Sequence, residues 1–457
     1  MARESIADLV ATLHNGKVDS REFFTRAIGA GLSVGLARQA LLAAGVSAQE
    51  LPEAARIGNP DVAHTTDTSK GMIKLYSSWP LTGSYDRIGG DAVEAVKLAL
   101  ADFGNAAGGF AIEYEALDDG VAANNGGWEA GKESENANKV VNDADAMVYM
   151  ATYNSGAAKI SIPILNAIPM AQISYANTYP GLTKGIDGAT EEGEPDKYYP
   201  SGVRNYMRVC PADDIQGAAA ADWATSEGKK AAYVIHDQSL YGKGVASVFK
   251  LKFEENGGTV LGFEGYDPKA TDYQALMASI ADKAPDIMMC GATVDNNAGK
   301  IVQDMRSIMG EEVAFLGPDG LNNNAFVEGG AEAAEGAYLT FAGYTPDKLV
   351  ELGGPGADYV TRMTAQLGYE QPADLDAYAC YGYETAVVVL QASERAGETD
   401  RTKILEAMMS TEGFVSLLGG TWAFTESGDT DSAIIGLSQV IDGKITYLKT
   451  LSGGTEA

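Results

Sequence analysis

The distribution of apolar and polar residues between positions 72 and 173 predicts strands and helices in alternation. An apolar run at 72–76 is typical of a buried strand, and apolar residues then recur at helical spacing from Ile88 to Phe103. The alternation continues, with strands predicted at 112–117, 147–150 and 170–173 and helices predicted through 140–141 and over 157–165. This first series indicates one α/β unit.

A second series of the same kind begins near Tyr206. Its predicted strands are 231–235, 260–263, 287–290 and 313–316, and its predicted helices are 245–255, 273–280 and 298–309. Parallel strands need crossover helices, so two such series imply an α/β protein with two doubly wound parallel sheets. Two long helices near 355–368 and 376–396 follow, and a strand-rich segment from 421 to 448 comes last.

Residues 1–48 have the features of an export signal. Arg21 and Arg26 lie around the start of a weakly apolar run at 27–36, and small residues at 46–48 offer a cleavage site. The segment resembles a twin-arginine signal that lacks one of the paired arginines; a retained amphipathic helix is the alternative. Residues 49–69 are polar and rich in turn-forming residues, so we expect a linker there. No other stretch approaches the ~20 apolar residues of a membrane helix.

Charge and cysteine content exclude several classes of protein. The chain has 63 acidic and 33 basic residues, a formal net charge of −30, and no basic stripe with interleaved aromatic residues. Such a surface repels nucleic acid, so we expect no nucleic-acid partner. Cys210, Cys290 and Cys380 form no CxxC pair, which excludes a zinc ribbon and argues against a disulfide framework. Cys290 lies in an apolar run and is expected to be a buried free thiol.

The motifs of common enzyme classes are absent or misplaced. His14, His64 and His236 are the only histidines and are too scattered for a catalytic zinc site. Residues 31–35 match the GxSxG pattern of a nucleophile elbow, but they lie in the export segment with no strand before them. No P-loop or complete dinucleotide fingerprint occurs. The sequence therefore predicts a protein without enzymatic activity, cofactor or metal.

Several short segments, taken in order, resemble the branched-chain amino-acid-binding proteins of ABC importers. The most specific is the segment at 235–242, whose DQSLYG sequence is similar to the family's hDxxxYG turn. The others are the opening strand and its loop at 73–83, the acidic pair at 118–119, the helix end at 140–143 and the GPDG turn at 317–320. The resemblance covers nearly all of 70–450, but an insertion at 184–202 has no close counterpart in the family.

This resemblance implies a type I periplasmic-binding fold, with two lobes joined by a three-segment hinge. The first lobe would comprise 70–210 and 342–419, and the second lobe 211–341 and 420–457. It also implies an exported, periplasmic or cell-surface monomer that closes on a small aliphatic L-amino acid and delivers it to the membrane subunits of an ABC importer. A neutral amide or urea-like ligand, or a sensor domain for a separate signalling partner, is the alternative.

The resemblance also suggests how a zwitterion would be bound. A carboxylate is best held by neutral donors at a helix start, and by similarity Asn154 and Ser155 would supply them; helix capping is the alternative. Ala176 and Thr178 match a loop whose backbone carbonyl and hydroxyl meet the ligand, with a polar turn as the alternative. Asp319, at the carboxyl end of a predicted strand, would pair with the ammonium group, and a solvated turn aspartate is the alternative.

Five further positions are expected to shape the pocket. Tyr241 would close over the ligand from the second lobe. Trp79, Tyr153 and Tyr378 are candidates for the side-chain pocket, although ordinary core aromatics would look the same. Thr293 stands at a ligand-facing position where the family often has an aromatic residue, and Tyr153 stands where a small residue is usual. These departures concern the choice of ligand more than the fold.

Overall fold

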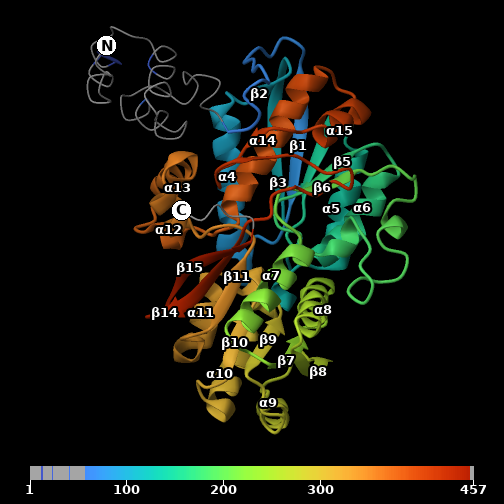
Figure 1. Ribbon diagram of the computed structural model, residues 1–457. Helices are drawn as coiled ribbons and strands as arrows, with labels where there is room; N and C mark the ends of the chain where they lie inside the picture. The colour runs from blue at the N-terminus through green and yellow to red at the C-terminus, as the bar shows by residue number, and fades with distance from the viewer. Residues whose placement is uncertain (1–11, 14–22, 24–40, 42–56, 453–457) are drawn as a thin grey trace.

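The computed structural model describes residues 12–13, 23, 41 and 57–452. From residue 57 onward the chain forms two α/β lobes that follow one another along the long axis of the molecule (Figure 1). The predicted export signal lies outside the described residues except at those few positions. Within the part of the chain that the structure describes, no helix combines the length and apolar character needed to cross a membrane.

The sheet of the first lobe has the strand order β2-β3-β1-β4-β5-β6 and is parallel except for β2. Side chains alternate across it, so Val148 and Met150 of β4 pack with α4 and α14, whereas Tyr149 and Ala151 pack with α5 and α6. Its strands are β1 (Met72–Ser78), β2 (Ala106–Ala107), β3 (Phe110–Leu117), β4 (Ala146–Ala151), β5 (Ala171–Ser174) and β6 (Tyr206–Arg208). Its helices are α4 (Asp86–Asp102), α5 (Ala130–Asn142), α6 (Ser155–Asn166), α12 (Pro346–Leu352), α13 (Gly354–Leu367), α14 (Ala379–Ala396) and α15 (Arg401–Met409).

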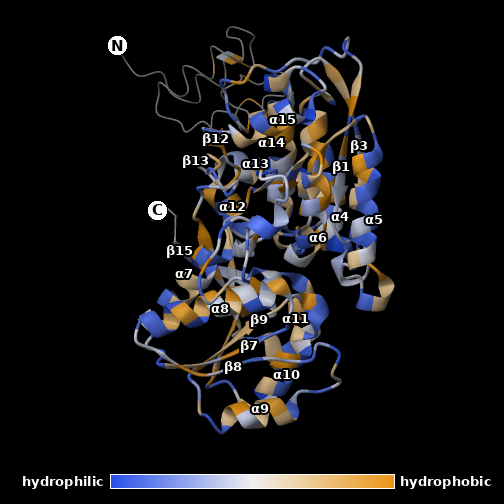
Figure 2. Cartoon of the chain, turned by 90° about the vertical axis from the view of Figure 1, so that its right-hand side faces the viewer, coloured by the Kyte–Doolittle hydropathy of each residue, from blue (hydrophilic) through white to orange (hydrophobic). Residues whose placement is uncertain are grey.

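The sheet of the second lobe has the order β15-β14-β11-β10-β9-β7-β8, in which β14 and β15 form an antiparallel hairpin beside five parallel strands. Helices α7 and α8 cover one face, and α9, α10 and α11 cover the other; Figure 2 shows β7, β8 and β9 between α8 and α10. The strands are β7 (Ala231–His236), β8 (Thr259–Gly265), β9 (Ile287–Gly291), β10 (Ala314–Gly317), β11 (Tyr338–Phe341), β14 (Ile435–Ile441) and β15 (Lys444–Ser452). The helices are α7 (Asp213–Ser226), α8 (Leu240–Glu255), α9 (Gln274–Ala281), α10 (Ala298–Met309) and α11 (Asn324–Gly330).

Three segments connect the lobes, at 209–212, 342–345 and 425–434. The predicted fold class, two α/β lobes with three connections, is confirmed. The third crossing lies later than position 420, where the sequence predicts it. The reason is that β12 (Phe414–Val415) and β13 (Thr421–Trp422) pair with each other, and Trp422 is buried in the core of the first lobe.

Some local features differ from the sequence prediction. The apolar pattern does not predict α7, because its run of alanines has no helical periodicity, and it does not predict α15. Residues 57–69, expected to be a linker, lie against the first lobe: Gly58 pairs with Val415, and His64 Nδ1 lies 2.6 Å from Glu394 Oε1. Cys210, Cys290 and Cys380 are all buried and free.

The insertion at 184–202 is a folded part of the first lobe. Tyr198 and Tyr199 pack with Tyr179 and with Ile162 of α6 in one apolar cluster. The side chain of Glu194 is fully buried and accepts a hydrogen bond from Tyr179 Oη at 2.6 Å. These contacts attach the insertion to the loop that follows β5, which is one of the loops predicted to meet the ligand.

Candidate ligand-binding cleft

The carboxyl ends of the parallel strands of both lobes meet at the boundary between them, which is where ligands commonly bind in such sheets. A cavity of about 710 Å³ opens there and is lined by Asn154 and Ser155 from the first lobe and by Tyr241 and Thr293 from the second. The other predicted site residues do not line this cavity and are at most 6% exposed: Trp79, Tyr153, Ala176, Thr178, Asp319 and Tyr378. A larger cavity, of about 980 Å³, lies beside α4, α11 and β15 and is lined by none of the predicted residues.

Hydrogen bonds join the lobes across the boundary, so the two lobes are in contact in this structure. Tyr85 Oη of the first lobe donates to Asp295 Oδ1 of the second at 2.6 Å. Tyr378 Oη, at the start of α14, donates to Asp319 Oδ2 after β10. Tyr85 and Asp295 were not predicted from the sequence, because each is an ordinary turn residue until the two lobes come together.

Asp319 accepts hydrogen bonds from both lobes. Tyr241 Oη donates to Asp319 Oδ1 at 2.8 Å, and Gln216 Nε2 donates to the same oxygen. The Gly320 N–H in turn donates to Tyr241 Oη at 2.8 Å, which fixes the ring at the start of α8. Burial raises the pKa of Asp319, while the donors Tyr378, Gln216 and Tyr241 oppose that rise. The predicted carboxylate is therefore buried at the lobe boundary rather than solvated.

The start of α6 presents backbone donors and one free side-chain oxygen to the cleft. Asn154 precedes the first residue of α6, Ser155, and within the described chain no side chain caps this helix start. Asn154 Oδ1 is buried and lacks a hydrogen-bond partner among the described residues. Ser155 Oγ accepts the Tyr179 N–H at 3.3 Å, which links α6 to the loop after β5. An uncapped helix start favours an anion, since its N–H groups carry partial positive charge.

The loop after β5 is held in a fixed shape by hydrogen bonds and carries a buried hydroxyl, that of Thr178. Ser174 Oγ accepts the N–H groups of Ala176 at 3.1 Å and of Asn177 at 2.8 Å. Asn177 Nδ2 donates to the Tyr153 carbonyl at 2.7 Å, which joins this loop to the one after β4. Thr178 Oγ1 is buried and lacks a hydrogen-bond partner among the described residues. The Thr178 side chain lies beside the carboxyl group of Asp213, whose pKa it lowers.

Four aromatic side chains pack against one another in the first lobe. The rings of Tyr153, Tyr175 and Tyr378 lie 5.8 to 6.1 Å apart, and Trp79 lies 4.7 Å from Tyr175. The Trp79 Nε1–H donates to the Gly89 carbonyl at 3.0 Å, so its polar group is already bonded. Tyr175 was not predicted, although it lies beside Ala176 at the end of β5; its buried hydroxyl has no partner among residues 57–452.

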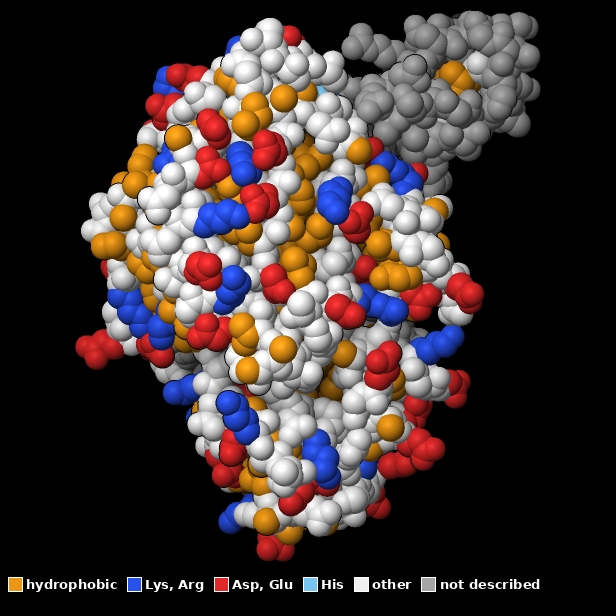
Figure 3. Space-filling model, turned by 180° about the vertical axis from the view of Figure 1, so that it is seen from behind, with side chains coloured by type: hydrophobic (Ala, Val, Ile, Leu, Met, Phe, Trp, Pro, Cys, Tyr) orange, Lys and Arg blue, Asp and Glu red, His pale blue; other side chains and the backbone are white. Residues whose placement is uncertain are grey.

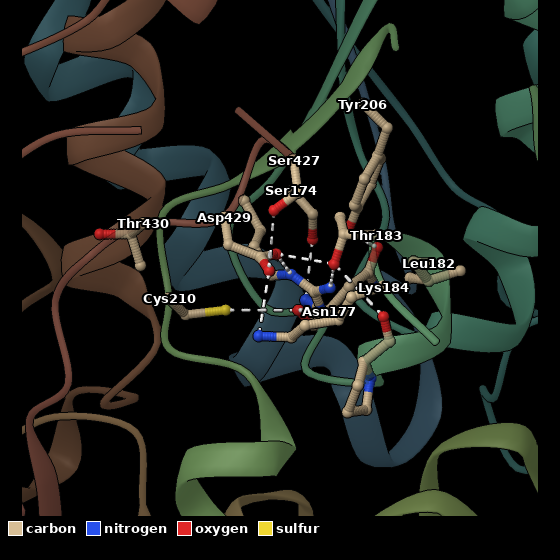
Figure 4. Close-up of polar contacts among 12 residues, drawn as sticks. Ser174, Asn177, Leu182, Thr183, Lys184, Tyr206, Cys210, Ser427, Asp429 and Thr430 are labelled. Atoms are coloured by element: carbon tan, nitrogen blue, oxygen red, sulfur yellow. Dashed lines mark hydrogen bonds and ion pairs between the residues drawn. The ribbon is translucent and has the colours of Figure 1, made fainter. Parts of the chain in front are cut away.

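A buried ion pair lies behind the loop after β5, at the first and third crossings. Arg208 is fully buried, and its Nε donates to Asp429 Oδ1 at 2.7 Å. Its Nη1 donates to the carbonyls of Asn177 at 3.0 Å and Tyr179 at 2.9 Å. Figure 4 shows Asp429, Asn177 and Thr183 gathered at this guanidinium group. Arg208 thus supports the loop that carries Thr178.

Three comparisons with known proteins, by family model, by sequence and by structure, find the same kind of protein. A family model described as periplasmic binding protein matches residues 73–440. The chain is 27% identical over 317 residues to Leu/Ile/Val-binding protein homolog 1 of Brucella suis, an alignment that covers 68% of this chain and 77% of that protein. The structure is similar to that of the leucine binding protein LivK of Thermotoga maritima, with a TM-score of 0.71, 23% identity, and coverage of 83% and 98% of the two chains. It is also similar to a solute binding protein of R. palustris in complex with benzoate, with a TM-score of 0.69, 20% identity, and coverage of 85% and 98%.

The likeness to these solved structures concerns the fold, and the family match extends it to the sequence. The matched residues begin in β1 and end in β14. They therefore include both lobes, all three crossings and every residue discussed at the lobe boundary. The chain belongs to the periplasmic binding protein family.

Proposed function

We propose that this protein is the exported binding component of an ABC importer and that it closes on a small L-amino acid. The Brucella relative is named for binding Leu, Ile and Val, and the Thermotoga relative for binding leucine. The observation that carries the proposal is Asp319, a buried carboxylate at the lobe boundary that accepts hydrogen bonds from both lobes and has no cationic partner in residues 57–452. A ligand ammonium group supplies the missing positive charge.

The other end of a zwitterion matches the first lobe. Its carboxylate is expected at the uncapped start of α6, where Asn154 and Ser155 stand, with Thr178 close to the ammonium group. Because these groups belong to different lobes from Asp319, one ligand contacts both lobes and favours the closed form by its differential affinity. Trp79, Tyr153 and Tyr378 would then bound an apolar side chain.

Two other ligand classes fit these groups less well. The R. palustris neighbour was solved with benzoate, whose only charge is negative and would oppose the carboxylate of Asp319. A neutral amide or urea would leave that carboxylate without a cation. Both classes remain in the test below because they bind without an ammonium group.

The proposal also covers where the protein acts and with which partners. Export through the twin-arginine-like segment at 1–48, action as a monomer and delivery of the ligand to the membrane subunits of an importer all belong to it, and it includes no catalytic step. Charge on the face shown in Figure 3 is consistent with a small-molecule ligand, because lysine and arginine side chains there are dispersed among acidic ones rather than gathered in a stripe.

Thermal unfolding with a ligand panel tests the proposal. The protein is unfolded and refolded to remove carried-over ligand, and then heated with L-amino acids, neutral amides, urea or benzoate. We expect aliphatic L-amino acids to stabilise it, by about 2.7 kcal/mol at a concentration one hundred times the Kd. Asp319→Asn should weaken this binding more than about a hundredfold, because it leaves the ammonium group unpaired. Asp282→Asn, an exposed change of the same kind, is the control. Stabilisation by amides or benzoate alone, or an unaffected Asp319→Asn variant, would contradict the amino-acid assignment.

A further inference from the structure

The insertion and the loop before it reach across the lobe boundary to α8. Helices α6 and α8 lie next to each other at this boundary (Figure 1). Leu240, at the start of α8, packs against the apolar cluster of the first lobe that contains Tyr179. Gly188 of the insertion lies beside Leu251, since a Cβ atom built on Gly188 would be 3.4 Å from Leu251 Cδ2. Leu240, Gly244 and Leu251 share one face of α8, because steps of four and eleven residues return to the same side of a helix. That face of α8 therefore meets the first lobe.

The ring of Tyr179 fills the space between two glycines, one in each lobe. A Cβ atom built on Gly244 of α8 would lie 2.4 Å from Tyr179 Cδ2 and 2.6 Å from its Cε2. A Cβ atom built on Gly181 would lie 2.4 Å from Tyr179 Cε1, on the other edge of the ring. Glycine is the poorest helix former apart from proline, and Gly244 stands in the second turn of α8. The Tyr179 ring explains this glycine, because no larger residue would admit the ring there.

Hydrogen bonds at both ends hold Tyr179 in this position. Its hydroxyl donates to Glu194 Oε2 of the insertion at 2.6 Å, and the Glu191 N–H donates to the same oxygen at 2.7 Å. Burial raises the pKa of Tyr179, so the hydroxyl keeps its proton and remains a donor. The Tyr179 N–H donates to Ser155 Oγ at 3.3 Å, and its carbonyl accepts from Arg208 Nη1 at 2.9 Å. The ring therefore cannot turn away from α8 unless the insertion or the start of α6 also moves.

We propose that Tyr179, held by the insertion, is a positioning residue that fits against Gly244 when the lobes close, so that the insertion raises ligand affinity without touching the ligand. The proposal rests on the function proposed above. Contacts that form only when the lobes close favour the closed form, and a larger closed population raises the apparent affinity by the same factor. Tyr179 does not line the cavity of the cleft. Its hydrogen bond to Ser155 links the contact with α8 to the helix start where the ligand carboxylate is expected.

Isothermal titration of the stripped full-length protein with L-leucine tests the proposal, together with small-angle X-ray scattering. In Gly244→Ala the added methyl group would overlap the Tyr179 ring, so we expect L-leucine to bind roughly tenfold or more weakly. The decrease in radius of gyration on ligand binding should need correspondingly more L-leucine. The ligand-free melting temperature should stay level or rise, because alanine favours a helix more than glycine and separated lobes leave room for the methyl group. Gly90→Ala, which meets open space in α4, is the control and should bind L-leucine as the unchanged protein does.

A double variant shows whether the two residues act through each other. Tyr179→Ala alone should weaken L-leucine binding, because the contact with α8 is lost. Gly244→Ala added to Tyr179→Ala should weaken it no further, since no ring is left for the methyl group to overlap. An equal loss of affinity from Gly244→Ala with and without the ring would overturn the proposal. Should Tyr179→Ala fail to fold, Tyr179→Val takes its place in the same comparison, because valine also lacks the two ring atoms that the methyl group would overlap.

The outcomes separate this inference from the function on which it rests. If the protein binds L-leucine and Gly244→Ala binds it equally well, the inference is overturned and the proposed function stands. A lower melting temperature of Gly244→Ala with unchanged affinity has the same meaning, because the contact then belongs to the fold in the presence and absence of ligand. If benzoate or a neutral amide binds and no L-amino acid does, the proposed function is overturned. The same titration of Gly244→Ala with that ligand then decides the inference.

Discussion

The buried pair of Arg208 and Asp429 offers a sharp test of what holds the crossings together. Asp429 Oδ1 accepts from Arg208 Nε at 2.7 Å and from the Thr183 hydroxyl at 2.9 Å, while Lys184 Nζ lies 3.2 Å from Asp429 Oδ2. The Arg208 N–H also donates to the Gly428 carbonyl at 3.0 Å, so the first and third crossings are joined by backbone as well as side chains. Asp429→Asn keeps an acceptor oxygen for Arg208 but removes the charge.

The loss of stability expected for Asp429→Asn follows from the burial of Arg208. Breaking a buried ion pair by removing one charge costs about 3–5 kcal/mol, because the remaining guanidinium stays buried without compensation. Burial by itself would raise the pKa of Asp429, but Arg208 and Lys184 outweigh it and lower that pKa from 3.8 to about 2. That difference corresponds to about 2.4 kcal/mol of pH-dependent stability. Because the folded pKa lies below the unfolded one, this stability is present above about pH 4 and is lost as the pH falls toward 2.

Urea unfolding at several pH values measures both effects. At pH 7 we expect Asp429→Asn to lower the free energy of unfolding by about 3–5 kcal/mol, and the exposed Asp431→Asn control to change it by less than about 0.5 kcal/mol. Between pH 7 and pH 3 the difference between the protein and the Asp429→Asn variant should shrink by about 1 kcal/mol, whereas the other acidic groups titrate in both and cancel. A difference that is small at pH 7, or that does not shrink in acid, would refute the ion-pair argument.

Two further predictions concern the two lobes separately. Gly89→Ala should destabilise the protein by about 1–3 kcal/mol or more, because its Cβ would lie 1.9 Å from the Pro80 carbonyl oxygen, whereas Gly90→Ala meets open space and should stabilise α4 by about 0.5–1 kcal/mol. Urea unfolding of the two variants should give opposite signs, and equal effects would contradict the packing argument. Burial, with help from Lys243, lowers the pKa of His236 from 6.5 to about 4. Because the folded pKa lies below the unfolded one, the neutral His236 ring contributes stability that is complete above about pH 6.5 and is lost as the pH falls toward 4. An NMR titration that finds the His236 ring protonated at pH 6 would show this to be wrong.

The sequence predicts the elements that have a clear period and a clear end. Strands such as β1 and β9 are continuous apolar runs, and polar turns mark the carboxyl ends of such strands, so the apolar pattern alone places Asn154 and Asp319 at strand ends. α7 could not be predicted in this way, because alanines give a helix propensity without an apolar stripe. The sequence also places the third crossing too early, at position 420. The hairpin β12–β13 is too short for its pattern to show that Trp422 is buried in the first lobe.

At the site, too, the sequence does not show which individual side chains are buried or meet one another. Asp213 and Asp214 are adjacent and chemically identical, and no sequence pattern says which of them is buried. The helix decides, because a rotation of about 100° per residue turns Asp213 toward the buried Gln216 and turns Asp214 toward Lys184. Tyr85 and Asp295 are likewise 210 residues apart in sequence, and only lobe closure brings them to 2.6 Å.

The distribution of charge at the crossings gives the ligand proposal its physical basis. Four aspartates gather there, namely Asp213, Asp214, Asp319 and Asp429, and the cations near them are Arg208 and Lys184. Arg208 and Lys184 lower the pKa of Asp429, while Asp213 and Asp319, which have no cation of their own in the described chain, have raised pKa values. Two buried carboxylates without a counter-charge are costly, and a cation close to them lowers that cost. If the ligand binds beside these carboxylates as proposed, we expect a ligand with a positive charge to stabilise the closed form more than a neutral or anionic one of the same shape.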